Sequence, residues 1–340
     1  MKQPRILIIY TGGTIGMIQE VADGPLVPFT LDAMLRKIPS IRDLGIELHS
    51  AELDEVIDSS NVTPEVWVQL ADIIGKNYAA YDGFVILHGS DTMAYTASAL
   101  SFMLDGLSKP VILTGSQLPI GLVRTDAREN LITTLSIAAM HENGVPLVNE
   151  VCIFFEDRLF RGNRTHKFNS ENFDAFLSVN YPVLADAGVH IKVHTEHLLA
   201  KPKGAFRTQT ALNTNIATLR LFPGIALTDY AEFFIAKKLE GLILETYGSG
   251  NGSTDETFLA SLRKMTAAGI VVLNVTQCQG GGVEMEKYAT GRALAEAGVL
   301  SGKDITVEAA LVKMMHVLGI STQLGERKRL LECDLKGEMT

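Results

Sequence analysis

Cysteine is scarce in this chain, and its placement suits neither a disulfide framework nor a zinc site. Only Cys152, Cys278 and Cys333 occur among 340 residues, and they are far apart. Secreted proteins that depend on disulfides carry more cysteines, usually in an even number. The sequence therefore argues against a disulfide-stabilised extracellular protein.

Long apolar runs are also missing. No run approaches the ~20 residues that a membrane-spanning helix needs. Residues 6–10 are apolar, but this stretch is too short for the core of a signal peptide. We therefore expect a cytoplasmic protein without a membrane partner.

Basic residues are outnumbered by acidic ones. Lys and Arg total 30 against 39 Asp and Glu, so the formal net charge is -9. An acidic surface repels phosphate backbones, and we expect no nucleic-acid partner. Hydrophobic residues make up 46% of the chain, close to the average of globular proteins, which excludes disorder or a coiled coil as its main structure.

Short β-branched runs recur in the first half of the chain, each followed by a small-residue turn and a helix-length segment. The predicted strands are residues 6–10, 83–87, 110–113 and 151–155. They are almost continuously apolar, as in a parallel sheet that helices cover on both faces. A helix is predicted to begin at Pro64 with Thr63 as its cap. This part is therefore predicted to be a doubly wound, mostly parallel α/β domain.

The pattern changes near residue 185. Residues 186–215 are polar and mixed, which predicts a hairpin and an interdomain connection. Predicted strands at 216–222, 241–244 and 269–275 then begin a smaller α/β domain. We divide the chain into an N-terminal catalytic α/β domain (1–190), a linker or hairpin (191–215) and a C-terminal α/β domain (216–340).

Small polar residues lie where the predicted strands end. They are Thr11, Thr14, Asp58, Ser59, Ser60, Ser90, Asp91, Thr92, Thr114 and Ser116. Open parallel sheets bind ligands beyond the carboxyl ends of their strands. These turns therefore predict a site for a small zwitterionic or carbonyl ligand.

The first turn does not fit a dinucleotide-binding loop. In G-x-G-x-x-G, Gly13 and Gly16 fit the last two glycines, but Thr11 stands at the first. No acidic residue clearly ends a second strand at the required distance, and no Gly-Lys-Ser/Thr loop follows a strand. A dinucleotide-dependent redox protein is disfavoured, and no cofactor is expected.

Thr14 is the candidate nucleophile, because small neighbours let a substrate approach its hydroxyl. A threonine hydroxyl needs a base to take its proton. His88 is interpreted as structural, since it precedes the second turn. Lys167 could relay a proton if it were buried beside Ser90 and Asp91, although spacing alone favours a solvated loop.

Histidines gather at His190, His194 and His197, with Glu196 between the last two. Their spacing is not that of an HExxH helix, and the segment alternates like a strand with one solvated face. We expect no metal site. Cys278 lies in a polar turn without a nearby base, so it is interpreted as structural.

Several motifs together resemble one enzyme family. YTGGTI at 10–15 and HGSDTM at 88–93 resemble the two signatures of bacterial L-asparaginases, in particular the cytoplasmic type I enzymes. The resemblance continues through TGSQ (114–117), RGNRT (161–165), YGSGN (247–251) and YATG (288–291). It implies hydrolysis of L-asparagine to L-aspartate and ammonia, with room for a weak L-glutaminase activity.

The resemblance also implies catalytic roles. Thr14 matches the nucleophile, which forms an acyl-enzyme ester with the substrate. Ser90, Asp91 and Lys167 match a second triad, in which Ser90 stands where the family usually has threonine. Asp91 also faces the α-ammonium group of the substrate.

Further residues match binding positions. Asp58, Ser59 and Ser60 match the segment that holds the α-carboxylate, and Ser116 contacts the leaving amide through its backbone. Family members are oligomers, and Asn251 matches a residue that reaches across to a partner chain. The resemblance therefore implies a homodimer or homotetramer.

The chain departs from the family pattern in the loop after the first motif. Residues 18–27 contain no tyrosine, and Leu26 takes the place where the family has one to assist Thr14. Glu20 and Asp23 are candidate bases, although a solvated loop is the favoured interpretation of both. The base for Thr14 is left open.

A second departure concerns regulation. Some type I enzymes have an additional asparagine site, which Thr276 and Cys278 match, with Gln277 between them. Glu245 stands where those enzymes have arginine. A carboxylate there repels the carboxylate of a ligand, so activation by asparagine is expected to be weak or absent.

Two other functions share part of the pattern. The amidase subunit of archaeal tRNA-dependent amidotransferases has these motifs after an extra N-terminal domain, whereas here the first motif starts at residue 10. A noncatalytic amino-acid-binding module would need the ammonium and carboxylate contacts, but neither Thr14 nor Lys167.

Overall fold

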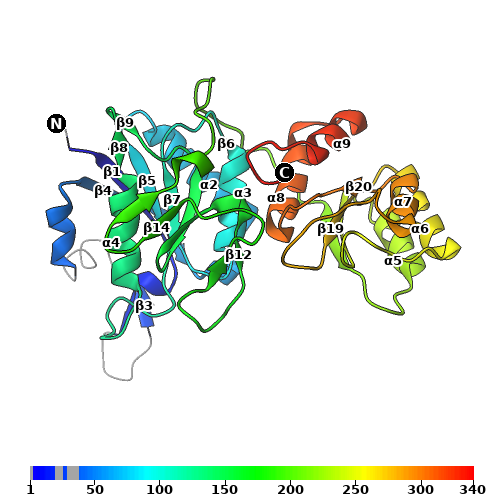
Figure 1. Cartoon of the computed structure of the whole chain (residues 1–340), viewed down its shortest axis with the longest axis horizontal. Helices are drawn as coiled ribbons and strands as arrows, with labels where there is room; N and C mark the ends of the chain where they lie inside the picture. The colour runs from blue at the N-terminus through cyan, green and yellow to red at the C-terminus, as the bar shows by residue number, and fades with distance from the viewer. Residues whose placement is uncertain (1–2, 20–25, 29–37) are drawn as a thin grey trace. The chain divides into compact units, whose positions relative to one another are not determined.

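The chain forms two compact units in a computed structural model that describes residues 3–19, 26–28 and 38–340 (Figure 1). Unit 1 comprises Met1–Gln209 and unit 2 comprises Thr210–Thr340. Each unit has its own sheet and its own hydrophobic core.

Unit 1 is built on an eight-stranded sheet with the order β15-β14-β11-β10-β7-β5-β1-β4. Strands β4, β1, β5, β7 and β10 are parallel, and β11, β14 and β15 extend one edge in antiparallel fashion. The strands are β1 (Arg5–Gly12), β4 (Glu47–Ile57), β5 (Gly83–Leu87), β7 (Val111–Thr114), β10 (Val151–Phe155), β11 (Arg158–Arg161), β14 (Ala185–Ala187) and β15 (Ile191–Val193).

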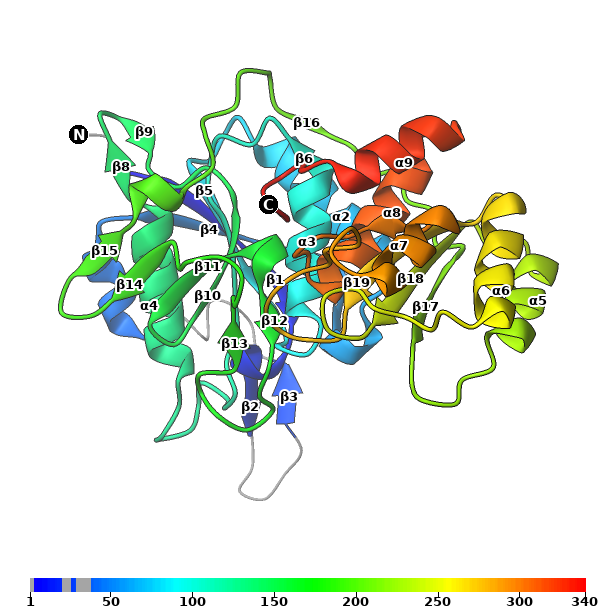
Figure 2. The same ribbon diagram turned by 45° about the vertical axis from the view of Figure 1, so that its right-hand side comes forward.

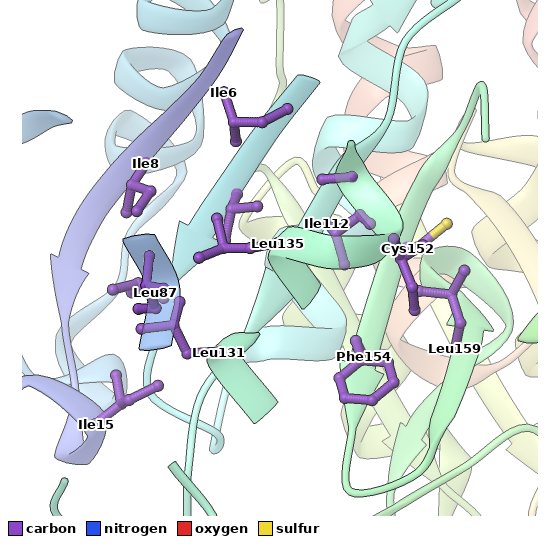
Figure 3. Close-up of a cluster of buried hydrophobic side chains, with 14 of the residues drawn as sticks. Ile6, Ile8, Ile15, Leu87, Ile112, Leu131, Leu135, Cys152, Phe154 and Leu159 are labelled. Atoms are coloured by element: carbon purple, nitrogen blue, oxygen red, sulfur yellow. The ribbon is translucent and has the colours of Figure 1, made fainter. Parts of the chain in front are cut away.

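Three α-helices are described in unit 1: α2 (Pro64–Asn77), α3 (Met93–Met103) and α4 (Ala127–Ala138). Helix α2 begins at Pro64 as predicted, but the Thr63 side chain makes no capping hydrogen bond. Leu131 and Leu135 of α4 pack with Ile112 and other strand residues in one buried cluster (Figure 3). Strand residues that point to the opposite face, such as Leu7 and Ile86, are equally buried. Both faces of the sheet are therefore covered, which explains its continuously apolar strands.

Shorter elements connect these layers. They are η1 (Thr14–Gly16), β2 (Met17–Gln19), β3 (Leu26–Pro28), η2 (Pro39–Leu44), η3 (Ser59–Asn61), β6 (Leu104–Asp105), β8 (His141–Glu142), β9 (Val145–Pro146), η4 (Gly162–Arg164), β12 (His166–Lys167), β13 (Phe176–Leu177), η5 (Thr195–His197) and β16 (Arg207–Thr208). The β14–β15 hairpin belongs to the large sheet, and residues up to Gln209 belong to unit 1.

Unit 2 contains a four-stranded parallel sheet with the order β17-β18-β19-β20. Helices α5 and α6 cover one face, and α8 and α9 cover the other (Figure 2). Its elements are β17 (Ile216–Arg220), α5 (Leu227–Ala236), β18 (Gly241–Thr246), α6 (Glu256–Ala267), β19 (Val271–Thr276), α7 (Ala289–Glu296), β20 (Leu300–Ser301), α8 (Val307–Ile320) and α9 (Leu324–Glu332).

The architecture confirms the predicted class, a larger, mainly parallel α/β part followed by a smaller α/β part. Among the residues that the structure describes, no helix combines the length and the apolar character required to cross a bilayer.

Candidate active site

The turns at the carboxyl ends of β1, β5 and β7 touch one another through glycines. Gly13 has φ +85°, and a Cβ there would lie 2.5 Å from the Gly89 nitrogen. A Cβ on Gly89 would lie 2.5 Å from Ser59 Oγ, and one on Gly115 would lie 2.4 Å from the His88 carbonyl oxygen. No side chain fits in these contacts, so four polar segments converge at one place.

Lys167 lies beside Ser90 and Asp91. Its Nζ donates to Ser90 Oγ at 2.8 Å and to Asp91 Oδ1 at 2.6 Å. The Lys167 side chain is only 16% exposed, whereas that of Asp91 is 64% exposed. The lysine therefore does not occupy the solvated loop that its spacing alone favours. The structure brings together the three residues that the motifs assign to the second triad.

The two hydroxyls of the first turn have different surroundings. Thr11 is buried, and its Oγ1 donates to the Leu87 carbonyl at 3.0 Å, which ties β1 to β5. Thr14 is half-buried at the start of η1, directly after the glycine pair. This difference leaves Thr14 as the candidate for reaction with a substrate and gives Thr11 a structural part.

Tyr10 braces this turn, which sequence reasoning did not foresee. Its hydroxyl donates to the Gly16 carbonyl at 3.1 Å. Burial, reinforced by Glu52, raises the pKa of Tyr10 to about 12. A phenol that remains protonated is a poor base, so Tyr10 does not replace the tyrosine missing from residues 18–27. Glu20 and Asp23 lie outside the described residues, and of Leu26 only the backbone, in β3, is described.

Asp58 and Ser60 form a small capped turn. Asp58 Oδ1 accepts from Ser60 N at 2.8 Å and from Ser60 Oγ at 2.6 Å. These hydrogen bonds to the ionised form lower the pKa of Asp58. Ser59 is buried, and its carbonyl accepts from Thr92 Oγ1 at 2.7 Å, which joins this segment to the turn after β5.

The turn after β7 is held by the predicted Ser116 and by Asp126, which sequence reasoning missed. Ser116 is buried, and its hydroxyl donates to the Leu118 carbonyl at 2.7 Å. The Asp126 carboxylate accepts from Gln117 N at 2.9 Å and from Leu118 N at 3.2 Å. Asp126 stands directly before α4, where a cap is common, but no sequence signal connects it to this turn.

Gln117 extends the triad. Its Oε1 accepts a long hydrogen bond from Ser90 Oγ at 3.4 Å, and its Nε2 donates to the Asn172 carbonyl at 2.9 Å. Gln117 is the last residue of the TGSQ motif, but the sequence analysis assigned it no role.

His88 has the structural part predicted for it. The ring is buried, with Nδ1 2.7 Å from the Gly89 carbonyl and Nε2 2.9 Å from Thr96 Oγ1. Trp67 Nε1 donates to the same hydroxyl at 3.1 Å. These contacts fit a neutral ring that donates from Nδ1 and accepts at Nε2. Burial lowers the pKa of His88 to about 4, which keeps the ring neutral.

Asn251 lies in unit 2, where its Oδ1 accepts from Thr290 Oγ1 at 2.6 Å. Its backbone bridges to Tyr247, closing the turn after β18.

The candidate regulatory residues also lie in unit 2, at the ends of β18 and β19. Glu245 is buried, and its carboxylate accepts from Thr218 Oγ1 at 3.2 Å and lies 3.5 Å from Arg220 Nη1. Gln277 Nε2 donates to the Glu245 and Leu221 carbonyls. The polar atoms of this segment are therefore largely engaged with the protein itself.

Thr276 and Cys278 close the same turn. Thr276 Oγ1 donates to the Gly248 carbonyl and accepts from Cys278 N at 3.0 Å. Cys278 is exposed. The first hydrogen bond ties the ends of β18 and β19 together.

Three of the four residues weighed as metal ligands come together: His194, Glu196 and His197. His190 is exposed and does not join them.

Comparisons with known proteins relate both parts of the chain to one family. The family model "Asparaginase, N-terminal" matches residues 5–199, and "Glutaminase/Asparaginase C-terminal domain" matches residues 215–331. L-asparaginase 1 of Escherichia coli K12 is 41% identical over 100% of this chain and 99% of its own. The human 60 kDa lysophospholipase is 42% identical over 99% of this chain and 61% of its own. The crystal structure of L-asparaginase I from Vibrio cholerae matches with a TM-score of 0.89 and 41% identity over 100% of both chains. The chain belongs to the asparaginase family.

Proposed function

We propose that this protein is an L-asparaginase, which hydrolyses L-asparagine to L-aspartate and ammonia. The observation that carries the proposal is the contact of two turns. Gly13, next to Thr14, packs against Gly89, and the following residue, Ser90, accepts a hydrogen bond from Lys167. A candidate nucleophile and a proton-handling group thus lie at neighbouring strand ends. The match to two L-asparaginases over the whole chain supports the same activity.

The proposed reaction has two steps. Thr14 Oγ attacks the amide carbon of the substrate, an ester forms and the C–N bond breaks. The amide nitrogen leaves as ammonia after accepting the proton that Thr14 loses. Water then attacks the ester, Thr14 Oγ regains a proton and L-aspartate leaves. Backbone N–H groups of the turns at Thr14 and Ser90 stabilise the oxyanion in both steps.

Proton transfer is assigned to Ser90, Lys167 and Asp91. A threonine hydroxyl is weakly nucleophilic unless a base takes its proton. We assign the relay of that proton to the Ser90 hydroxyl and Lys167 Nζ, which are hydrogen-bonded to each other. Asp91 contacts Lys167 through Oδ1, so its exposed carboxylate retains Oδ2 for the α-ammonium of the substrate. Asp58, Ser59 and Ser60 hold the α-carboxylate, and the Ser116 backbone contacts the leaving amide.

The test is ammonia release from L-asparagine by wild type and two matched variants. Thr14→Val and Thr11→Val each remove one hydroxyl from the same turn and keep a β-branched side chain. We expect Thr14→Val to lose activity at least 1000-fold, while Thr11→Val, which loses only the bond to Leu87, retains most of its kcat. Mass spectrometry of the denatured wild type after rapid quenching should find aspartyl ester on Thr14. Equal activity in the two variants would refute the nucleophile assignment.

Substrate range is measured in the same preparation. A pocket distinguishes one methylene by only ~1–3 kcal/mol, so we propose a weak activity on L-glutamine. Because one relative is named a lysophospholipase, lysophosphatidylcholine hydrolysis is measured alongside. If Thr14→Val lost lysophosphatidylcholine hydrolysis but still released ammonia from L-asparagine, the proposed function would be contradicted.

We also propose that the active enzyme is a homo-oligomer in which the partner's Asn251 completes the site. Thr14→Val and Asn251→Ala proteins, each inactive alone, are mixed, denatured and refolded together. In a homodimer, random pairing yields half mixed dimers, each with one intact site, so about a quarter of wild-type activity should return. No recovery, in a mixture that size exclusion shows to be dimeric, would exclude the shared site.

Activation by asparagine at a second site is proposed to be weak or absent. The Glu245 carboxylate is negative and already engaged with Thr218, and Gln277 is turned toward backbone carbonyls. Hyperbolic kinetics in L-asparagine are expected. Sigmoidal kinetics that disappear on changing Thr276 or Cys278 would contradict this proposal.

A further inference from the structure

Two histidines flank the short helix η5 at one edge of unit 1. His194 directly precedes η5 and His197 ends it. The two imidazole rings lie beside each other, tilted by 33°. Their ring centroids are 5.5 Å apart, and one ligand atom each from His194, Glu196 and His197 lie within 4.8 Å of one another. Three residues of one turn thus offer donors to a common point.

Neighbouring acceptors determine which ring nitrogens are available. His194 Nε2 lies 2.7 Å from Asp186 Oδ2, and His197 Nδ1 lies 3.1 Å from the Val183 carbonyl. Each contact takes the N–H of a neutral ring. The lone pairs are then on His194 Nδ1 and His197 Nε2, and His194 Nδ1 is 3.9 Å from Glu196 Oε1. Orientation of a ligating histidine by a carboxylate or a backbone carbonyl is characteristic of metal sites.

We propose that His194 Nδ1, His197 Nε2 and the Glu196 carboxylate bind one divalent transition-metal ion of the zinc class. Imidazole nitrogens favour such ions over magnesium or calcium. Zinc–nitrogen bonds of about 2.0–2.1 Å place tetrahedral ligand atoms about 3.4 Å apart, so the cluster must contract slightly. The exposed Glu196 side chain can make that movement, and water occupies the fourth position.

The charges around the cluster favour a cation. Asp186 and Glu196 are both carboxylates, and Lys192, opposite Asp186 in the β14–β15 pair, is exposed. Arg161, whose Nη2 donates to the His197 carbonyl at 2.8 Å, is neutralised by its buried ion pair with Glu150. A bound ion would link η5 to β14, the strand that carries Asp186.

The test is calorimetric titration of ZnCl₂ into the full-length, tag-free protein after treatment with EDTA, at pH 7.5. One ion per chain is expected. Glu196→Ala, His194→Ala and His197→Ala should each weaken binding at least tenfold, and Asp186→Asn should weaken it ~10–100-fold through the orientation of His194. Glu196 is exposed, so its variant keeps the fold even if a histidine variant does not.

Matched controls separate this site from other donors. His190→Ala and Cys278→Ser remove an exposed histidine and an exposed thiol outside the cluster, and zinc affinity should not change. Electron paramagnetic resonance of the Cu²⁺-loaded protein should show nitrogen hyperfine coupling that His194→Ala reduces. Absence of zinc binding by wild type, or binding that follows Cys278 or His190 instead of the cluster, would overturn the proposal.

Discussion

Replacement of Gly13 by alanine should damage catalysis more than folding. The substitution adds one methyl group between the turn that carries Thr14 and the turn that carries Ser90. That Cβ would lie 2.5 Å from the Gly89 nitrogen and 2.6 Å from its Cα, both backbone atoms. Reaching an ordinary contact of 3.4 Å requires the turns to separate by about 0.9 Å.

Two costs follow from this geometry. Alanine at φ +85° is left-handed, which costs about 1–2 kcal/mol of stability. A displacement near 1 Å between reacting groups lowers the rate by about 100-fold. The first cost acts on folding, whereas the second acts on the alignment of Thr14 with Ser90 and Lys167 in the proposed mechanism.

Gly144→Ala is the matched control. Gly144 has φ +79°, similar to that of Gly13, but nothing lies within 4 Å of its Cβ position. Alanine at position 144 therefore has the same conformational cost in stability as alanine at position 13, but it pushes no turns apart. Melting temperature and steady-state kcat and KM for L-asparagine are measured for both variants.

We expect both variants to melt a few degrees below wild type, since 1 kcal/mol corresponds to about 2–4 °C for a domain of this size. Gly144→Ala should retain wild-type kcat, and Gly13→Ala should lose about 100-fold. If Gly13→Ala retained kcat within threefold while folded, close contact between the turns would not be needed, and the reasoning about the site would be wrong.

Three further predictions concern titratable groups. Lys167→Met should lower kcat by about 10²–10⁴-fold with little change in KM. Lys167→Arg should lose as much, because a guanidinium group does not release a proton. Steady-state kinetics with L-asparagine measure both variants. Burial lowers the pKa of His88 from 6.5 in the unfolded chain to about 4 in the folded protein. The stability that depends on a neutral His88 is therefore complete above pH 6.5 and decreases by about 3 kcal/mol as the pH falls from 6.5 to 4. Urea unfolding of wild type and His88→Gln should show a shallower acid decline in the variant. Lys313 and Glu338 form a fully buried ion pair at 2.6 Å. Lys313→Met or Glu338→Gln alone should lower the free energy of unfolding by about 3–5 kcal/mol, because each leaves its partner buried and unpaired. The double variant removes both partners and should therefore lose less stability than the two single variants added together. An additive double variant would contradict the pairing.

The sequence alone determined the main layers of the fold and indicated which turns form the candidate site. Residues 83–87 and 151–155 are apolar throughout because both faces of those strands are covered, and burial of this kind is visible residue by residue. The TGGT and HGSD turns are equally local, since their glycines are needed where backbones touch. Hydroxyls after apolar strands predict a ligand site at this edge of the sheet, and the turns that carry them meet there through Gly13, Gly89 and Gly115.

Contacts between distant segments were decided only by the tertiary structure. Lys167 contacts Ser90 and Asp91, which lie 77 and 76 positions earlier in the sequence. Nothing in the basic sequence around Lys167 distinguishes it from a solvated lysine. Thr14 is the candidate nucleophile from the sequence, and the structure adds that the Thr11 hydroxyl is engaged with the Leu87 carbonyl. The orientation of the two histidine rings at η5 depends on Asp186 of β14 and on the Val183 carbonyl in the loop before β14. Such partners are chosen by packing, in which each side chain takes the hydrogen bond that burial makes costly to leave unmade.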